Sequence, residues 1–403
     1  MTSVNLRHLH YFREVARRRS ISAASQSVHL SQPALTQAMA ALERWFGALL
    51  LVRGSTGVEL TPAGRMCADR VERALRHLGD AVAETARAPG RDGRGAGDRS
   101  RSLRTLQLQA LVAVVEHGNF TQAARAQKVS QPTIHRAARE LERMMGIPLF
   151  EKTSFGVVPT READRLARRA KLAFREIAQA RAEVQALDGG ESGRTVVGSM
   201  PLARSQLIPG AVLEFSKEFP EHSISILEGT YAYLLSALRS GEADFLVGAL
   251  RDPPPPGDVV QEHLFDDPLA VIVRAGHPLA GRKRLTAAAL SQYDWIAPRT
   301  GSPLRAHFEA IFTSAGLPVP PRPIECNSLA AARALLLESD RVMLLSAHQI
   351  HYERKAGMLV ALPHPAGRVV RPIGLTRRSD WRPTAAQERL LELLRRRASG
   401  LQG

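Results

Sequence analysis

A fourteen-residue pattern occurs twice in this chain of 403 residues, and it constrains the fold more than any other feature. The stretch "SQPALTQAMAALER" begins at Ser31, and "SQPTIHRAARELER" begins at Ser130, 99 positions later. Internal repeats mark a structural unit that a chain uses more than once. The two copies therefore predict two domains of the same fold in the N-terminal half.

Each copy has the pattern of a helix with one buried side. A Ser stands at the expected N-cap, and the Pro two residues later falls in the first turn, where its missing N–H is not needed. Apolar side chains then recur at i, i+3, i+4 and i+7, which defines a buried stripe. The stripe consists of Leu35, Ala38, Met39 and Leu42 in the first copy and of Ile134, Ala137, Ala138 and Leu141 in the second.

A short Ala-rich helical segment precedes each copy, so each pair of helices predicts a helix-turn-helix. In that motif the N-terminal part of the second helix contacts base edges in the major groove of DNA. Gln suits adenine, Arg suits guanine, and a Pro or Thr side chain can touch the thymine methyl group. The predicted DNA-binding residues are Ser31, Gln32, Pro33, Thr36 and Gln37 in the first copy and Ser130, Gln131, Pro132, His135 and Arg136 in the second.

A predicted hairpin, or wing, follows each of these helices. The sequences are "LLLVRGSTGVELT" after Gly47 and "LFEKTSFGVVPT" after Gly146. Arg53 and Lys152 would lie over phosphates, which fix the register of a protein on DNA without reading its sequence. Two plain helical hairpins in an all-α protein would leave the repeated Ser-Gln-Pro and the wings unexplained.

The charge of the chain is concentrated in the same half. The formal net charge is +16, and residues 1–190 carry 30 Lys and Arg against 18 Asp and Glu, whereas residues 191–403 carry 25 against 21. A strongly basic region indicates a polyanionic partner. The first twenty residues lack the apolar core of a secretion signal, and no stretch is apolar enough to span a membrane. We therefore expect a cytoplasmic protein with a nucleic-acid partner and no membrane partner.

Composition also predicts the domain boundaries. Residues 88–103 are rich in Gly, Arg, Asp and Ser and are expected to form a flexible linker, with one winged helix and its following helix in 1–87 and the other in 104–188. From residue 194 to 397, short apolar runs alternate with helical patterns, which is typical of a sheet covered by helices. The two cysteines, Cys67 and Cys326, are expected to be buried thiols without a metal or disulfide.

With its wing and its preceding helix, each copy resembles the N-terminal winged helix-turn-helix of the LysR-type transcriptional regulators. The likeness rests on "LHYFREVARRRSISAAS", "SQPALTQAMAALERWFG" and "LTPAG" in the first copy and on "LVAVVEHGNFTQAAR", "SQPTIHRAARELERMMG" and "LFEK" in the second. Residues 194 to about 376 resemble the effector-binding part of the same family. The resemblance implies a multidomain chain: two winged helix-turn-helix domains with long linker helices, then a two-lobed α/β domain like those of periplasmic solute-binding proteins.

The resemblance also implies an effector site between the two lobes. In such folds ligands bind beyond the carboxyl ends of strands and at helix N-termini, where free N–H groups favour anions. The implied effector-binding residues are Ser199, Met200, Arg204, Thr230, Ser302, Asn327 and Ser328. Most of these residues have a simpler interpretation as helix caps or turn residues, and Arg204 as a solvated side chain.

The predicted function is a sequence-specific, DNA-binding transcriptional regulator controlled by a small-molecule effector. The expected partners are double-stranded DNA, a small organic or sugar acid, a second copy of the chain, with a dimer favoured, and RNA polymerase. The alternative is a cytoplasmic solute-binding or sensor protein with only architectural DNA binding. No nucleophile elbow, metal-ligand spacing or carboxylate pair indicates an enzyme or a cofactor. The paired copies further predict that helices 62–87 and 160–187 associate within one chain.

Overall fold

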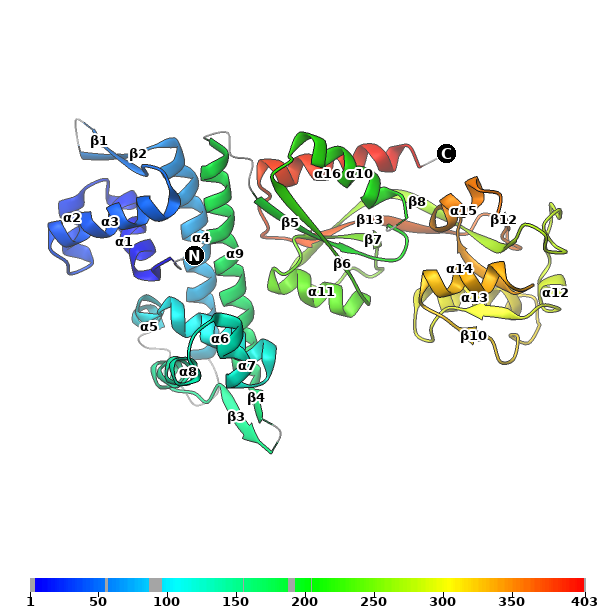
Figure 1. Cartoon of the computed structure of the whole chain (residues 1–403), viewed down its shortest axis with the longest axis horizontal. Coiled ribbons are helices and arrows are strands. Elements are labelled where there is room, and N and C mark those ends of the chain that lie inside the picture. Colours follow the sequence, from blue (N-terminus) through cyan, green and yellow to red (C-terminus); the bar gives the residue numbers. More distant parts are fainter. Residues whose placement is uncertain are drawn as a thin grey trace. The chain divides into compact units, whose positions relative to one another are not determined.

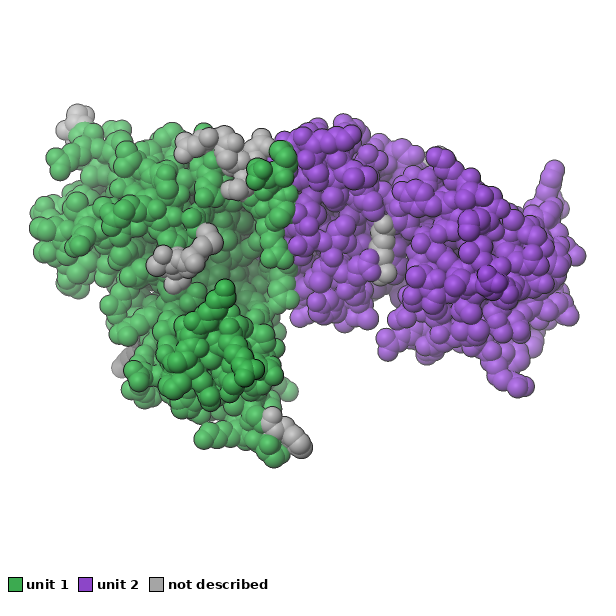
Figure 2. All heavy atoms as spheres, viewed as in Figure 1, with its two compact units in different colours: residues 1–194, 220–223, 239–242 green, residues 195–219, 224–238, 243–403 purple. Residues whose placement is uncertain are grey.

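The computed structural model describes residues 4–54, 57–86, 96–154, 156–187, 193–203 and 205–401. They form two compact units (Figure 2). Unit 1 comprises residues 1–194 with the short segments 220–223 and 239–242, and unit 2 comprises the rest. None of the described helices is both long and apolar enough to cross a membrane.

Head 1, residues 4–60, is a winged helix-turn-helix. Ser20 and Ser31 cap the N-termini of its second and third helices. Gly47 follows the third helix in a left-handed conformation, which ends that helix. The wing is an antiparallel hairpin, and its Val58 N–H donates to the Arg19 carbonyl over 2.9 Å. The elements are α1 (Leu6–Arg18), α2 (Ile21–Ser27), α3 (Gln32–Phe46), β1 (Leu51–Gly54) and β2 (Gly57–Leu60).

Head 2, residues 104–159, repeats this structure. Ser130 caps the third helix, Gly146 ends it, and the wing N–H of Val157 donates to the Gly118 carbonyl over 3.1 Å. Both predicted apolar stripes are buried in one continuous core. The prediction of two helix-turn-helix folds is therefore confirmed at the level of local structure. The elements are α6 (Thr105–His117), α7 (Phe120–Gln127), α8 (Gln131–Met145), β3 (Phe150–Thr153) and β4 (Gly156–Pro159).

Two long helices, α4 (Pro62–Ala86) and α9 (Arg161–Leu187), follow the heads and pack side by side (Figure 1). Arg70, near the start of α4, pairs with Glu183 near the end of α9, whereas Glu84 near the end of α4 pairs with Arg169 near the start of α9. The two helices are therefore antiparallel. Each head is attached to the start of its own helix, so the heads lie at opposite ends of the pair.

One expectation about the linker is wrong. Residues 88–95 lie outside the described residues, but the rest of the segment expected to be flexible contains a helix, α5 (Ala96–Ser102). Leu103 is fully buried and Ser100 nearly so, and α5 packs against α4, where Gly79 faces Ser100. Composition pointed to a solvated segment, but one buried leucine and a close helix approach hold this part in place.

Unit 2 is built on a nine-stranded mixed sheet that makes two lobes. Lobe A contains β5 (Gly193–Ser199), β6 (His222–Glu228) and β7 (Phe245–Ala249). Lobe B contains β9 (Trp295–Ala297), β10 (Ile324–Glu325), β11 (Val342–Ser346) and β12 (Leu359–Pro363). The long strand β8 (Val259–Arg274) joins them: its first part pairs with β13 (Val370–Arg378), and its last part pairs with β11 and β12.

Helices cover both faces of each lobe, because alternate strand residues enter different cores. In lobe A, Val197 belongs to the core under α10 and α16, whereas Val196 belongs to the core under α11. In lobe B, Val271 packs toward α12 and α13, and Ile272 packs toward α14. The helices are α10 (Leu207–Glu218), α11 (Tyr231–Ser240), α12 (Ala287–Leu290), α13 (Pro303–Thr313), α14 (Leu329–Leu337), η1 (Ala347–Ile350), α15 (His351–Lys355) and α16 (Ala385–Ser399).

The two cysteines have different surroundings. Cys67 is fully buried in the core of unit 1, as expected, and burial raises the pKa of its thiol to about 12. Cys326 is only partly buried, so the expectation of a buried thiol is wrong there. It lies just after β10, in the segment that leads to α14, where its Sγ donates to the Ser328 carbonyl over 3.3 Å.

Candidate DNA-binding heads and effector site

The N-terminal end of α3 and that of α8 present the predicted base-contacting side chains to solvent. Ser31 accepts the N–H of Ala34 over 3.3 Å, and Ser130 accepts the N–H of Thr133 over 3.4 Å, so both hydroxyls also act as helix caps. The remaining predicted residues are exposed on the side opposite the buried stripe: Gln32, Pro33, Thr36, Gln37, Gln131, Pro132, His135 and Arg136.

The heads differ at corresponding positions, which are 99 residues apart. Gln37 of head 1 corresponds to Arg136 of head 2, and neither forms a hydrogen bond or ion pair with any other described residue. Thr36 corresponds to His135. The Thr36 hydroxyl donates to the Gln32 carbonyl over 2.9 Å, which leaves its methyl group available, whereas the His135 ring packs edge-on against a phenylalanine. The two heads therefore offer different chemistry to a base pair.

The wings place one exposed cation each beside these helices. Arg53 lies on β1 and Lys152 on β3, and both side chains are exposed. Each wing is fixed to its own helix by a buried or partly buried carboxylate. Glu43 accepts two backbone N–H groups at the start of the first wing, over 2.9 and 3.1 Å, and Glu142 does the same in head 2 over 2.9 and 3.2 Å. These hydrogen bonds therefore attach the start of each wing, just before its cation, to the helix that precedes the wing.

The effector residues predicted in lobe A follow the carboxyl ends of β5 and β6. Ser199 is fully buried, and Met200 is nearly so, with its N–H donating to the Val247 carbonyl over 3.0 Å. Thr230 is exposed and caps α11 by accepting the N–H of Tyr233 over 3.3 Å. Arg204 lies outside the described residues.

The residues predicted in lobe B follow β9 and β10. Ser302 caps α13 by accepting the N–H of Arg305 over 3.3 Å, and Ser328 caps α14 by accepting that of Ala331 over 3.3 Å. Asn327 and Ser328 are exposed. Within the described residues no hydrogen bond joins this group to the group in lobe A. Figure 2 shows the surface of unit 2 hollowed between the two lobes.

A buried charged cluster at the junction of the lobes escaped the sequence analysis. Asp267 of β8 is fully buried and accepts hydrogen bonds from the Ser346 hydroxyl, from His348 Nδ1 over 3.0 Å and from Arg371 Nη2 over 2.8 Å. These partners lie 79 to 104 positions away in the chain. The local signal was the Asp-Asp pair inside the apolar run "LFDDPLAVIV".

The architecture of the two units defines a class of protein. Two winged heads expose the predicted base-contacting residues and carry one exposed cation on each described wing, and a separate two-lobed α/β unit has the layout of a small-molecule receptor. Together they define a ligand-controlled DNA-binding regulator.

Comparison with known proteins assigns the family. Residues 6–65 and 105–164 each match the family described as bacterial regulatory helix-turn-helix protein, lysR family, and residues 188–399 match the LysR substrate binding domain. The chain belongs to the LysR family of transcriptional regulators. Members are DNA-binding regulators controlled by small-molecule effectors and are not enzymes, so the predicted function class is confirmed.

The relatives differ in how much of the chain they match. The HTH-type transcriptional regulator GalR of Pseudomonas putida is 33% identical over 391 residues, which are 97% of this chain and 96% of GalR. PcaQ of Agrobacterium fabrum is 30% identical over 300 residues, which are 74% of this chain and 96% of PcaQ. The similarity to GalR therefore spans both heads and unit 2.

Two solved structures share the fold. A full-length OxyR variant from Pseudomonas aeruginosa has a TM-score of 0.54 at 22% identity and covers 73% of this chain and 93% of its own. CbnR, a LysR family transcriptional regulator, has a TM-score of 0.52 at 24% identity and covers 72% of this chain and 98% of its own.

Proposed function

We propose that one chain reads both halves of its DNA site, and that the two halves differ in sequence. The observation that carries this proposal is the antiparallel packing of α4 on α9 within one chain. A second contact supports it, because the Thr105 hydroxyl at the start of head 2 donates to the Val4 carbonyl over 2.6 Å and accepts the Leu6 N–H over 3.3 Å. Both contacts hold the heads at a fixed separation, as reading two half-sites requires.

The difference between the half-sites follows from the corresponding reading residues. Gln37 favours adenine and Arg136 favours guanine, because each side chain makes a two-point contact with that base in the major groove. Successive major grooves on one side of the duplex are about 34 Å apart, which sets the expected distance between the half-sites. The operator is therefore expected to be asymmetric.

Selection of binding sites from random DNA tests this proposal. The recovered sites should contain unlike half-sites in pairs, and the mass of the complex should give one bound chain for each pair of half-sites. Arg136→Ala should weaken binding by about 1–3 kcal/mol and relax the preference in one half-site only, and Gln37→Ala should do the same in the other. Perfect palindromes with one half-site protected per chain would contradict the intrachain pair. Unchanged preference in both variants would favour architectural DNA binding.

We infer that unit 2 binds a small organic or sugar acid between its lobes. Thr230, Ser302 and Ser328 stand at the starts of helices at least nine residues long, where unpaired N–H groups and the helix dipole favour an anion. All three follow carboxyl ends of strands, where ligands of such sheets bind. Asn327 adds an exposed amide beside Ser328, and the predicted residues Ser199 and Met200 lie buried at the carboxyl end of β5.

A thermal-shift screen of organic and sugar acids checks the effector site. A ligand that binds only the folded state raises the melting temperature, and Thr230→Val should abolish the rise for a hit by removing a polar contact. Thr286→Val is the matched control, because Thr286 caps α12 in the same way by accepting the Ala289 N–H over 3.2 Å. An equal response in both variants would remove Thr230 from the site.

We further propose that two chains associate and together supply four heads. Unit 2 of each chain would then transmit the effector signal to the DNA-bound heads, and the assembly would act on RNA polymerase in the cytoplasm. The mass of the protein–DNA complex, measured with and without a hit from the screen, gives the number of chains.

A further inference from the structure

The α4–α9 pair has an approximate two-fold axis. Arg70 Nη2 lies 2.6 Å from Glu183 Oε1, and the residues 99 positions away repeat the contact, since Arg169 Nη2 lies 2.7 Å from Glu84 Oε1. In the sequence, His77 is midway between Arg70 and Glu84, and Glu176 is midway between Arg169 and Glu183. His77 and Glu176 therefore correspond to each other and lie nearest the axis.

The two-fold symmetry breaks down at the axis, because Glu176 carries a buried charge that its counterpart His77 does not reproduce. Glu176 is only 4% exposed, and it accepts hydrogen bonds from Arg70 Nη1 over 2.9 Å and from Arg73 Nε and Nη2 over 3.0 and 2.8 Å. Burial opposes the charge of Glu176, but the hydrogen bonds from Arg73 and Arg70 outweigh it and hold the pKa below its usual range. The residues that correspond to Glu176 and Arg73 are His77 and Leu172, which cannot form this contact.

Pairs of identical helices would lack this complementarity. Two copies of α9 would bring two buried Glu176 carboxylates together, with Leu172 where Arg73 should be. Two copies of α4 would bring Arg73 toward His77 with no carboxylate between them. In the α9 pair each Glu176 would keep Arg169 in the place of Arg70 but would lose Arg73, and in the α4 pair Arg73 would lose its carboxylate. Losing a partner of a buried charge is destabilising, so either arrangement is penalised relative to α4 with α9.

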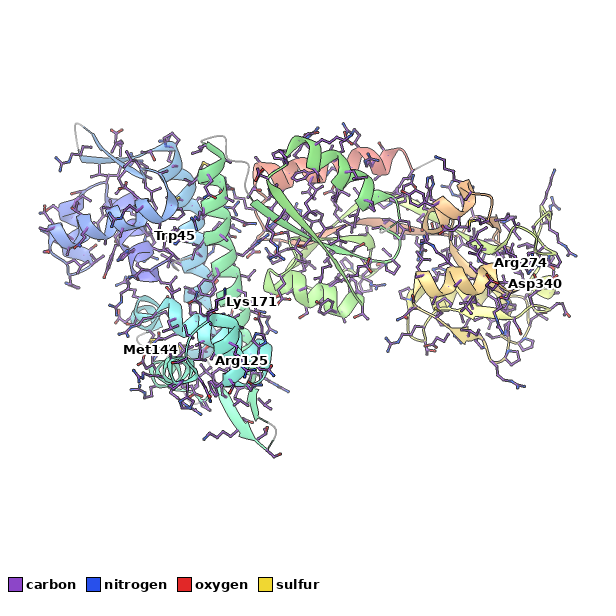
Figure 3. The ribbon with its side chains drawn as sticks, in the orientation of Figure 1. Trp45, Arg125, Met144, Lys171, Arg274 and Asp340 are labelled. Carbon is purple, nitrogen blue, oxygen red and sulfur yellow. The ribbon has the colours of Figure 1, made fainter. Side chains whose placement is uncertain are left out.

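A second contact also depends on unlike partners. The Arg181 guanidinium of α9 lies 5.0 Å from the ring centre of Trp45 in head 1, within cation–π distance. The corresponding residues are Val82 on α4 and Met144 in head 2, and both are apolar. Figure 3 labels Trp45 and Met144, each in its own head. A cation–π contact therefore forms on one side of the axis, between Arg181 and Trp45, whereas the equivalent positions on the other side hold the apolar residues Val82 and Met144.

We propose that Glu176, with Arg70 and Arg73, selects the α4–α9 pair over α4–α4 and α9–α9 pairs. Each chain thereby closes its own pair of linker helices, and a second chain associates through other surfaces. The inference rests on the proposed function only in taking the paired heads to bind DNA together.

Charge reversal in the full-length chain tests the selection. Arg73→Glu and Glu176→Arg should each weaken binding to DNA with two half-sites by about tenfold or more, because each places like charges together in a buried position. Binding to DNA with a single half-site should stay unchanged, which shows that the heads remain folded. The double variant in one chain should recover part of the affinity, because the contact between positions 73 and 176 is attractive again while Arg70 faces a like charge. Arg73→Gln and Glu176→Gln serve where a reversal prevents folding.

Two further measurements complete the test. Arg169→Glu is the matched control, because the symmetric pair Arg169–Glu84 is about one-third exposed and its reversal should change affinity by less than about threefold. The separately purified Arg73→Glu and Glu176→Arg chains should not restore each other when mixed. Wild-type affinity in both single variants, or recovery on mixing, would overturn the inference. A different result would separate the two proposals. If the selected sites were palindromic and the double variant still recovered affinity, only the proposal that the two half-sites differ in sequence would be overturned.

Discussion

DNA binding by the full-length chain should weaken by about 10³-fold or more when NaCl rises from 50 to 200 mM, as for proteins that make six to ten phosphate contacts. Residues 1–190 carry 30 basic against 18 acidic side chains. Each cation placed on a phosphate releases condensed counterions, and added salt opposes that release. Two heads bound to one duplex double the number of such contacts.

A titration of affinity against salt, on a selected site and on unrelated DNA, measures this effect. Arg53→Ala and Lys152→Ala should each lower the slope of log affinity against log salt by about one and weaken both DNAs alike, because phosphate contacts carry no sequence information. Arg354→Ala, an exposed cation of α15 in unit 2, should leave the slope unchanged. A shallow slope in the wild-type chain would mean that the heads do not lie on the phosphates.

The sequence was most informative where the structure is local. The helical period, the buried side and the exposed side can all be derived from one spacing, that of Leu35, Ala38, Met39 and Leu42. The second copy, which begins its stripe at Ile134, has the same spacing and supports the same prediction. The Ser caps and the glycines that end α3 and α8 act within one helical turn. The exposed positions of Gln37 and Arg136 followed directly from the buried stripe.

The sequence was least informative where partners come from distant segments. Leu103 looked like part of a polar linker, because its burial depends on helices that precede and follow it in the chain. The partners of Asp267 and Glu176 lie about 80 to 110 positions away, and no periodicity records such pairs. Of the predicted effector residues, Thr230, Ser302 and Ser328 proved to cap helices, and a cap and an anion contact have the same sequence signature.

The buried cluster around Asp267 leads to the second large expected effect. Asp267→Asn should destabilise unit 2 by about 3–5 kcal/mol, because it leaves Arg371 as a poorly compensated charge in the interior. The Arg371 side chain is 15% exposed, and Asp267 and Ser346 are fully buried, so water replaces little of the lost interaction. The adjacent Asp266→Asn is the matched control: its side chain is half exposed and pairs with His263, so its effect should be below about 1 kcal/mol.

Urea unfolding followed by tryptophan fluorescence measures the effect in unit 2 alone. Trp295 and Trp381 are buried there, and Trp45 is the only other tryptophan, so a Trp45→Phe background limits the signal to unit 2. The midpoint for Asp267→Asn should fall by about 1 to 2 M relative to Asp266→Asn. Asp267 lies where β8 leaves β13 and joins β11, so the same variant should also weaken the coupling between the lobes and lower the affinity for any effector held between them. Equal midpoints for the two variants would show that the cluster contributes little to the stability of the junction.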